Sequence, residues 1–255
     1  MGPTSLVLFL AIAGVASYVQ TMTGFAFGLV MMGALALTRL MPLPDAAVMV
    51  GVLTLVNAGQ MMLHGGWHHV ARRELCLILC ASLPSVVAGF FLLEWLADTR
   101  ADLLKLVLGL VIILSSLQLA VQRRALRQRS PGRSFVGFGI VSGLMGGLFS
   151  TSGPPLVYHL YRQPLPAAQI RETLVAAFGA AQVVRLSLVV GTGNVPPLST
   201  FAGIAAVPVV MGMTYAARRW PLPLSARMQK AVVFALLFLS GLSLALPSLL
   251  RLLAA

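Results

Sequence analysis

The run Ser150-Thr151-Ser152-Gly153-Pro154-Pro155 interrupts a long apolar segment in the second half of the chain. The run Thr21-Met22-Thr23-Gly24 interrupts a similar segment in the first half. Each break separates two apolar runs that are shorter than the roughly 20 residues a membrane-spanning helix needs. These four short runs cover residues 5–20, 24–38, 135–149 and 152–161. The chain therefore contains two broken apolar pairs.

Composition places the rest of the chain in a lipid bilayer. Of its 255 residues 58% are hydrophobic and 9% are charged, and the mean hydropathy is +0.93. A soluble domain of this size needs far more charge to cover its surface. The net charge of +12 lies in short gaps between apolar runs and forms no basic stripe with aromatics, so we expect no nucleic-acid partner. Six further apolar runs are long enough to span, at 46–63, 75–93, 103–121, 172–190, 198–215 and 229–250.

The two halves of the chain align on their breaks. The matched pairs are Gly14 with Gly143, Thr21 with Ser150, Thr23 with Ser152 and Gly24 with Gly153 at a shift of 129, and Asn57 with Gln182 and Gln60 with Arg185 at a shift of 125. This pattern predicts repeat 1 at 5–121 with a hairpin at 5–38, a basic linker at 122–134, and repeat 2 at 135–250 with a hairpin at 135–161.

The positive-inside rule orients these segments. If the arginine-rich linker is cytoplasmic and each short pair returns to the side it entered, the cytoplasmic segments are 64–74, 122–134, 162–172 and 216–230. They hold most of the 18 Lys and Arg residues. Each half then crosses the membrane an odd number of times. We therefore predict an all-α polytopic membrane protein of two inverted-topology repeats, each a broken or re-entrant helix pair plus three full transmembrane helices. The alternative is that each short pair forms one continuous broken span. The two halves would then be parallel, and the charge difference between the two sides of the membrane would be weaker.

The breaks are the first candidate site. Backbone that leaves helical geometry at membrane depth is tolerated only where protein or a watery cavity supplies hydrogen-bond partners. Half-helices starting near Gly24 and Gly153 would point free N–H groups and positive dipole ends at one place, which favours an anion. Pro154 and Pro155 suit the first turn of such a helix. The alternative is that Gly and Pro only kink ordinary spans.

Arg185 is the second candidate, because it is the one arginine inside a predicted span. It lies one turn after Gln182, and Asn57 and Gln60 show the same spacing in the other half. These four side chains could complete an anion site, with bidentate contact from the guanidinium. The alternative is that Arg185 snorkels to the membrane surface.

Other polar residues carry weaker signals. Arg171 and Glu172 begin the helix that carries Gln182. Their position is consistent with a structural role, as an ion pair or cap, and equally with a role in gating. Three histidines in a short loop, His64, His68 and His69, are more typical of a membrane interface than of a metal site. His159 is expected in the core, with a protonatable role as the alternative, and Cys76 and Cys80 are expected to be buried small residues. We find no enzymatic motif, and so predict no enzyme, no catalytic residue, no metal and no cofactor.

Gly143-Leu144-Met145-Gly146-Gly147, then Ser152-Gly153-Pro154-Pro155-Leu156-Val157, then Arg171 resemble the second-repeat signature of the TauE/SafE sulfite-exporter family, also called the toluene-sulfonate uptake permeases. Thr23-Gly24-Phe25-Ala26-Phe27-Gly28 is similar to its first-repeat motif. The resemblance implies transport of sulfite, organosulfonates or related compounds across the bacterial inner membrane, in either direction.

Together these patterns predict a secondary transporter that works by alternating access. Its partners would be the lipid bilayer and a small anion, with H⁺ or Na⁺ as a possible coupling ion. The predicted substrate-binding residues are Thr21, Thr23, Gly24, Asn57, Gln60, Ser150, Thr151, Ser152, Gly153, Gln182 and Arg185, with Arg171, Glu172, Pro154 and Pro155 as gating or structural residues. An anion channel and a non-transporting membrane scaffold are the alternatives.

Overall fold

The computed structural model describes residues 3–23, 25–38, 40–63, 69–120, 126–195, 205–220 and 226–254. These residues form ten α-helices and no β-strand, so the predicted all-α fold class is confirmed. Five of the helices are long and apolar enough to cross a membrane. Their candidate spans are Thr4–Thr21, Leu43–Met61, Arg72–Ala97, Gly132–Phe149 and Ala167–Gly191.

The helices follow the predicted order in both halves. The first half contains α1 (Pro3–Thr23), α2 (Phe27–Thr38), α3 (Leu43–Met61), α4 (Arg72–Thr99) and α5 (Ala101–Ala120). The second half contains α6 (Gly132–Phe149), α7 (Gly153–Tyr161), α8 (Ala167–Gly191), α9 (Ala206–Arg219) and α10 (Ala226–Ala254). The breaks at 24–26 and 150–152 separate α1 from α2 and α6 from α7.

The first helix of each broken pair is longer than its apolar run. α1 has 21 residues and α6 has 18, and both contain a candidate span, whereas α2 has 12 and α7 has 9. The expectation that all four runs are too short to span was therefore wrong for the first run of each pair. The reason is that α6 begins at Gly132 and takes Arg133 and Ser134 into its first turn, and an apolar run leaves such residues out.

The six other predicted spans coincide with helices, with one difference. α9 begins at Ala206, and its 14 residues make a short apolar helix, whereas the sequence predicted a full span at 198–215. Residues 198–204 lie outside the described part of the chain.

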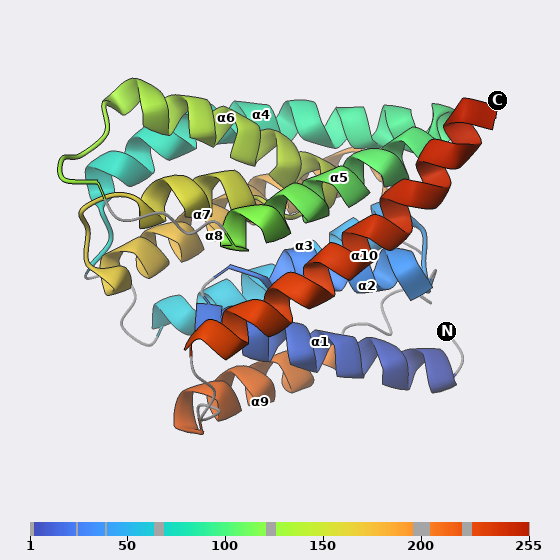
Figure 1. Ribbon diagram of the computed structural model, residues 1–255, viewed down its shortest axis with the longest axis horizontal. Helices are drawn as coiled ribbons and strands as arrows, with labels where there is room; N and C mark the ends of the chain where they lie inside the picture. Colours follow the sequence, from blue (N-terminus) through green and yellow to red (C-terminus); the bar gives the residue numbers. More distant parts are fainter. Residues whose placement is uncertain are drawn as a thin grey trace.

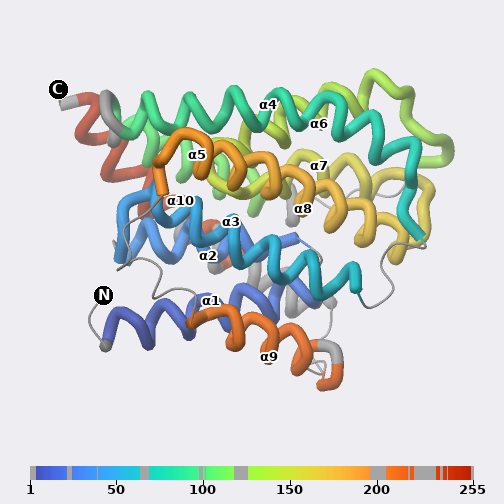
Figure 2. Tube along the Cα trace, turned by 180° about the vertical axis from the view of Figure 1, so that it is seen from behind, coloured from blue at the N-terminus to red at the C-terminus, as the bar shows by residue number. Residues whose placement is uncertain are grey.

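Glycines bring α4 and α6 into close contact along one edge of the molecule (Figure 1). A Cβ atom added at Gly143 would lie 2.2 Å from the backbone oxygen of Ser82, and one at Gly147 would lie 2.2 Å from that of Val86. Small residues at such spacing let membrane helices approach closely. α1 packs on α9 along the opposite edge, as Figures 1 and 2 both show. Between the two edges, α3 packs on α8 and α5 packs on α10.

Three of the four predicted cytoplasmic segments meet at one end of the bundle. The N–H of Leu126 donates to the backbone oxygen of Arg162 (2.7 Å), and Arg129 Nη1 lies 3.1 Å from Glu74 Oε1. The segment before α6 therefore lies beside the end of α7. Both chain ends lie at the opposite end of the molecule, on the right of Figure 1. There Arg251 Nη1 lies 3.4 Å from Asp102 Oδ1.

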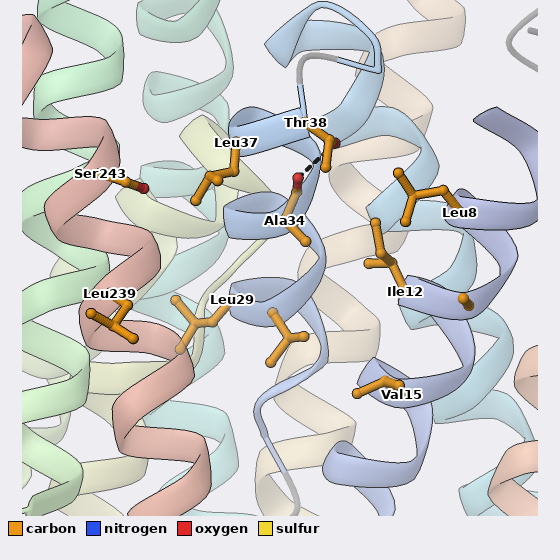
Figure 3. A pocket seen from close by; sticks show the side chains of 11 residues that line it. Leu8, Ile12, Val15, Leu29, Ala34, Leu37, Thr38, Leu239 and Ser243 are labelled. Carbon is orange, nitrogen blue, oxygen red and sulfur yellow. Dashed lines mark hydrogen bonds between the residues drawn. The ribbon is translucent and has the colours of Figure 1, made fainter. Parts of the chain in front are cut away.

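The outer surface carries many apolar side chains, as a lipid-facing surface requires. Cys76 and Cys80 lie on it, so the expectation that they are buried was wrong. A lipid-facing helix surface is as apolar as a core, and sequence alone does not separate the two. An open groove of about 710 Å³ runs between α1, α2 and α10. Figure 3 shows Leu8 and Ile12 facing Ala34 on one side of α2, and Leu37 on the other side toward Ser243.

Candidate functional site

The two breaks contact each other inside the bundle. A Cβ atom added at Gly28, in the first turn of α2, would lie 2.9 Å from Thr151 Cγ2 and 3.0 Å from the backbone oxygen of Ser150. One added at Gly153 would lie 3.6 Å from the backbone oxygen of Phe25. Two segments that are far apart in the sequence therefore form one contact region. Gly24 and the side chain of Thr23 lie outside the described residues.

Ser150 ends α6 in a left-handed conformation, with φ 54° and ψ 22°. This conformation costs roughly 1–2 kcal/mol for a residue with a Cβ atom. Three hydrogen bonds hold it. Its N–H donates to the Gly146 oxygen (2.9 Å), its Oγ donates to the Ala47 oxygen (2.5 Å), and its own carbonyl accepts from Gln182 Nε2 (3.1 Å). The break is thus held by α3 and α8.

Arg185 lies inside the bundle, 1% exposed. Its Nε donates to the backbone oxygen of Gly147 (3.0 Å), and its guanidinium carbon lies 5.8 Å from the centre of the Phe90 ring. Its Nη1 is buried and has no hydrogen-bond partner, and no carboxylate of the described residues forms an ion pair with it. The Arg185 side chain therefore does not snorkel to the membrane surface. A buried cation that forms no direct ion pair is costly, and such a site favours an anion.

Three further polar atoms, in the break after α6 and on α8, are buried and have no hydrogen-bond partner among the described residues. They are Thr151 Oγ1, Ser152 Oγ and Gln182 Oε1. Buried polar groups are paired in the large majority of cases, so a group of orphaned atoms requires an explanation. We call the four residues Thr151, Ser152, Gln182 and Arg185 the α7–α8 cluster.

The matched residue of the first half, Asn57, is in a different situation. It is 0% exposed, its Nδ2 donates to Thr214 Oγ1 (2.8 Å), and its Oδ1 accepts from Gln20 Nε2 (3.0 Å). Gln20 Oε1 in turn accepts from the N–H of Phe27 (3.0 Å). Ser17 Oγ lies 2.8 Å from Thr214 Oγ1. We call Ser17, Gln20, Asn57 and Thr214 the Gln20 network. It joins α1, α3 and α9 and caps the start of α2.

The four polar residues predicted as one wall of a site are therefore divided between two places. Gln182 and Arg185 bond to the end of α6, whereas Asn57 belongs to the Gln20 network and Gln60 Nε2 donates to the Met211 oxygen (3.3 Å). Thr21 Oγ1 donates to the Ser17 oxygen in its own helix (2.8 Å). Gln20 is not among the residues predicted from the sequence, because the shift of 129 pairs it with Phe149.

The starts of α2 and α7 offer fewer free N–H donors than the sequence predicts. Pro154 and Pro155 occupy the first turn of α7 and have no N–H. At α2, the N–H of Phe27 already donates to Gln20. The two hydroxyls and the guanidinium of the α7–α8 cluster are therefore its principal donors, and the dipole of α7 adds a positive end.

The remaining residues lie away from this cluster. Arg171 is exposed, and Glu172 Oε2 accepts from the N–H of His69 (3.1 Å), which ties the segment before α4 to the start of α8. His64 and His68 lie outside the described residues. His159 is buried between Phe135 and Phe138, with ring centroids 4.5 and 4.4 Å away, as the core placement predicts.

A bundle of apolar helices around a buried polar cluster is typical of a multi-pass membrane transporter. A family model described as "Sulfite exporter TauE/SafE" matches residues 9–244. The chain belongs to the TauE/SafE family, and it is a multi-pass protein of the inner membrane.

Two relatives extend over most of the chain. It is 36% identical over 239 residues to the "Probable sulfite/organosulfonate exporter TauE" of Cupriavidus necator, covering 94% of this chain and 93% of the relative. It is 29% identical over 203 residues to the "Probable inner membrane transporter protein TsaS" of Comamonas testosteroni, covering 76% and 81% of the two chains. No solved structure matches this chain.

Proposed function

We propose that this chain is a secondary transporter that exports a small sulfur-containing oxyanion, such as sulfite or an organosulfonate. The anion binds at the α7–α8 cluster, between the break at 150–152 and the middle of α8. The name of the Cupriavidus necator relative supports both the substrate class and the direction.

The observation that carries this proposal is the environment of Arg185. Its Nε is held by a backbone oxygen while its Nη1 points at no partner, so the guanidinium is fixed in place with a donor to spare. An oxyanion would take that donor, form the direct ion pair that Arg185 lacks, and accept from the Thr151 and Ser152 hydroxyls. Because the donors are held in advance, binding need not order them first.

We also propose that the two halves are inverted repeats. The helix packing supports this, because contacts come in matched pairs when α1–α5 are superimposed in order on α6–α10. The fourth helix of each half packs on the first helix of the other, in the pairs α4–α6 and α9–α1. The third helices pack on each other, and so do the fifth. The aligned glycines Gly14 and Gly143 both lie at such a contact.

Burial of the cluster supports a mechanism of alternating access. Every residue of the α7–α8 cluster is at most 6% exposed, so an anion can enter or leave only if helices move. The Gln20 network fastens α2 to α1, α3 and α9, whereas the other break is fastened to α3 and α8. Because α3 takes part in both sets of bonds, we propose that α1, α2 and α9 rock about α3 against α8 and the break at 150–152, and so open the cluster to one side at a time.

Replacing Arg185 with Gln tests the site. The purified wild-type protein in detergent is expected to bind methanesulfonate in a calorimetric titration, and Arg185→Gln is expected to weaken binding at least tenfold, because a charge-assisted hydrogen bond is lost. Arg251→Gln is the matched control, since Arg251 is exposed and pairs with Asp102 far from the cluster. Equal binding by wild type and Arg185→Gln would remove Arg185 from the site.

Flux through proteoliposomes separates the proposal from its alternatives. A transporter gives sulfite flux that saturates with concentration and falls in Arg185→Gln. Conductance that does not saturate would indicate a channel instead. No flux and no binding of any sulfonate or of sulfite would indicate a scaffold.

A further inference from the structure

The α7–α8 cluster contains an acceptor as well as donors. Gln182 is 1% exposed, and its Oε1 has no hydrogen-bond partner among the described residues. An oxyanion without a proton can only accept hydrogen bonds, so it would satisfy Arg185 and the hydroxyls and leave this oxygen unpaired. An unpaired buried acceptor loses its bonds to water without compensation.

The orientation of the Gln182 amide is determined by its other end. Gln182 Nε2 lies 3.1 Å from the backbone oxygen of Ser150, an atom that only accepts. A flipped amide would place two oxygens against each other, so the free atom is the oxygen.

The oxygen also faces a place where this chain supplies no donor. A Cβ atom added at Gly51 in α3 would lie 2.8 Å from Gln182 Oε1 and 3.4 Å from Ser150 Oγ. Ser150 Oγ donates to Ala47, so its proton is already used. Glycine at position 51 leaves room for the buried Oε1, which any larger residue there would displace.

We propose that the preferred substrate is a monoanion that also donates a hydrogen bond. One cation, Arg185, matches one negative charge, and Gln182 Oε1 accepts from a hydroxyl or an acidic proton on the same small molecule. The two side chains lie one helical turn apart, with about 5–6 Å between their Cβ atoms, a span that one small molecule bridges. Hydroxyalkyl sulfonates and hydrogen sulfite meet both conditions, whereas simple alkyl sulfonates and dianions meet one at most. This inference rests on the proposed anion site.

The matched probes are 2-hydroxyethanesulfonate and 1-propanesulfonate, which have the same charge and the same number of heavy atoms. In calorimetric titrations, the wild type is expected to bind the hydroxyl compound about tenfold more tightly, the usual effect of one hydrogen bond to a buried group. Gln182→Met, which removes the acceptor, is expected to reduce this preference to less than about twofold.

Gly51→Ala provides a second variant that leaves Gln182 in place. Its new methyl group displaces Oε1, so the preference should fall as in Gln182→Met. Gly59→Ala on the same helix is the control, because nothing lies within 4 Å of a Cβ atom there, and it should keep the wild-type preference. Helical circular dichroism and thermal unfolding of each variant report folding separately.

The outcomes separate this inference from the proposed function. If wild type binds both probes equally and Arg185→Gln weakens both, the anion site stands and the role of Gln182 Oε1 is wrong. If neither probe binds to wild type, the proposed function itself fails. A preference that survives in both Gln182→Met and Gly51→Ala would also overturn the inference.

Discussion

At the scale of single residues, the amide side chains of Asn57 and Gln182, which align between the two halves, have different roles. Asn57 makes hydrogen bonds with both ends of its side chain, to Thr214 and from Gln20, and so fastens three helices together. Gln182 uses its Nε2 to hold the break at Ser150 and leaves its oxygen unpaired. An amide with both its donor and its acceptor hydrogen-bonded stabilises a fold, whereas an amide with an unpaired oxygen needs a ligand to pair that oxygen.

Gln20 should therefore matter for stability. Gln20→Ala leaves Asn57 Oδ1 and the Phe27 N–H buried without partners, which costs about 1–3 kcal/mol for each unsatisfied group. We expect a clearly lower midpoint of thermal unfolding in detergent. Thr38→Ala is the control, since the exposed Thr38 hydroxyl donates only within its own helix, and it should change the midpoint little. An unchanged midpoint for Gln20→Ala would show that the Gln20 network does not stabilise the protein.

At the scale of helices, the α4–α6 pair depends on glycines that are spaced four apart. Gly139, Gly143 and Gly147 face α4, and a Cβ atom at each would lie within 3.1 Å of its backbone. The α5–α10 pair uses the same device at Gly109 and Gly241. Lipid gives membrane helices little hydrophobic reason to associate, so close backbone packing is what holds such pairs.

Gly143→Ala tests this packing. Its methyl carbon would lie 2.2 Å from a backbone oxygen, so the two helices must separate, and overpacking of this kind usually costs about 1–3 kcal/mol. Gly137→Ala is the matched control on the same helix, with nothing within 4 Å of its Cβ atom. We expect a lower unfolding midpoint for Gly143→Ala and an unchanged or slightly higher one for Gly137→Ala. Equal midpoints for the two variants would contradict close packing of α4 on α6.

At the scale of the whole molecule, charge distinguishes the two ends of the bundle. The end that joins residues 69–74, 126–134 and 162–172 carries most of the described arginines, while both chain ends lie at the other. The positive-inside rule then places the arginine-rich end in the cytoplasm.

Cysteine labelling in spheroplasts tests this orientation. In a background with Cys76→Ser and Cys80→Ser, which removes both cysteines of the chain, a membrane-impermeant maleimide should label Arg251→Cys in intact spheroplasts. Arg129→Cys should react only after the membrane is permeabilised, because the positive-inside rule predicts its segment on the cytoplasmic side. The reverse pattern would invert the predicted topology.

The sequence by itself determined the solvent, the helical class, the places of both breaks and the residue that carries the buried charge. These features depend on local composition and on the length of apolar runs, which the thickness of the bilayer selects. Arg185 stood out because a cation within a span has few harmless explanations.

Only the tertiary structure decided which polar groups are satisfied. Asn57 takes its hydrogen bonds from residues 37 and 157 positions away, and Gln182 takes its own from a residue 32 positions away. Such pairings depend on how helices pack and not on the residue types, which are alike at the two positions. The aligned amides of Asn57 and Gln182 were therefore predicted to belong to one site. In the folded protein, Asn57 joins three helices, whereas Gln182 keeps an oxygen without a partner.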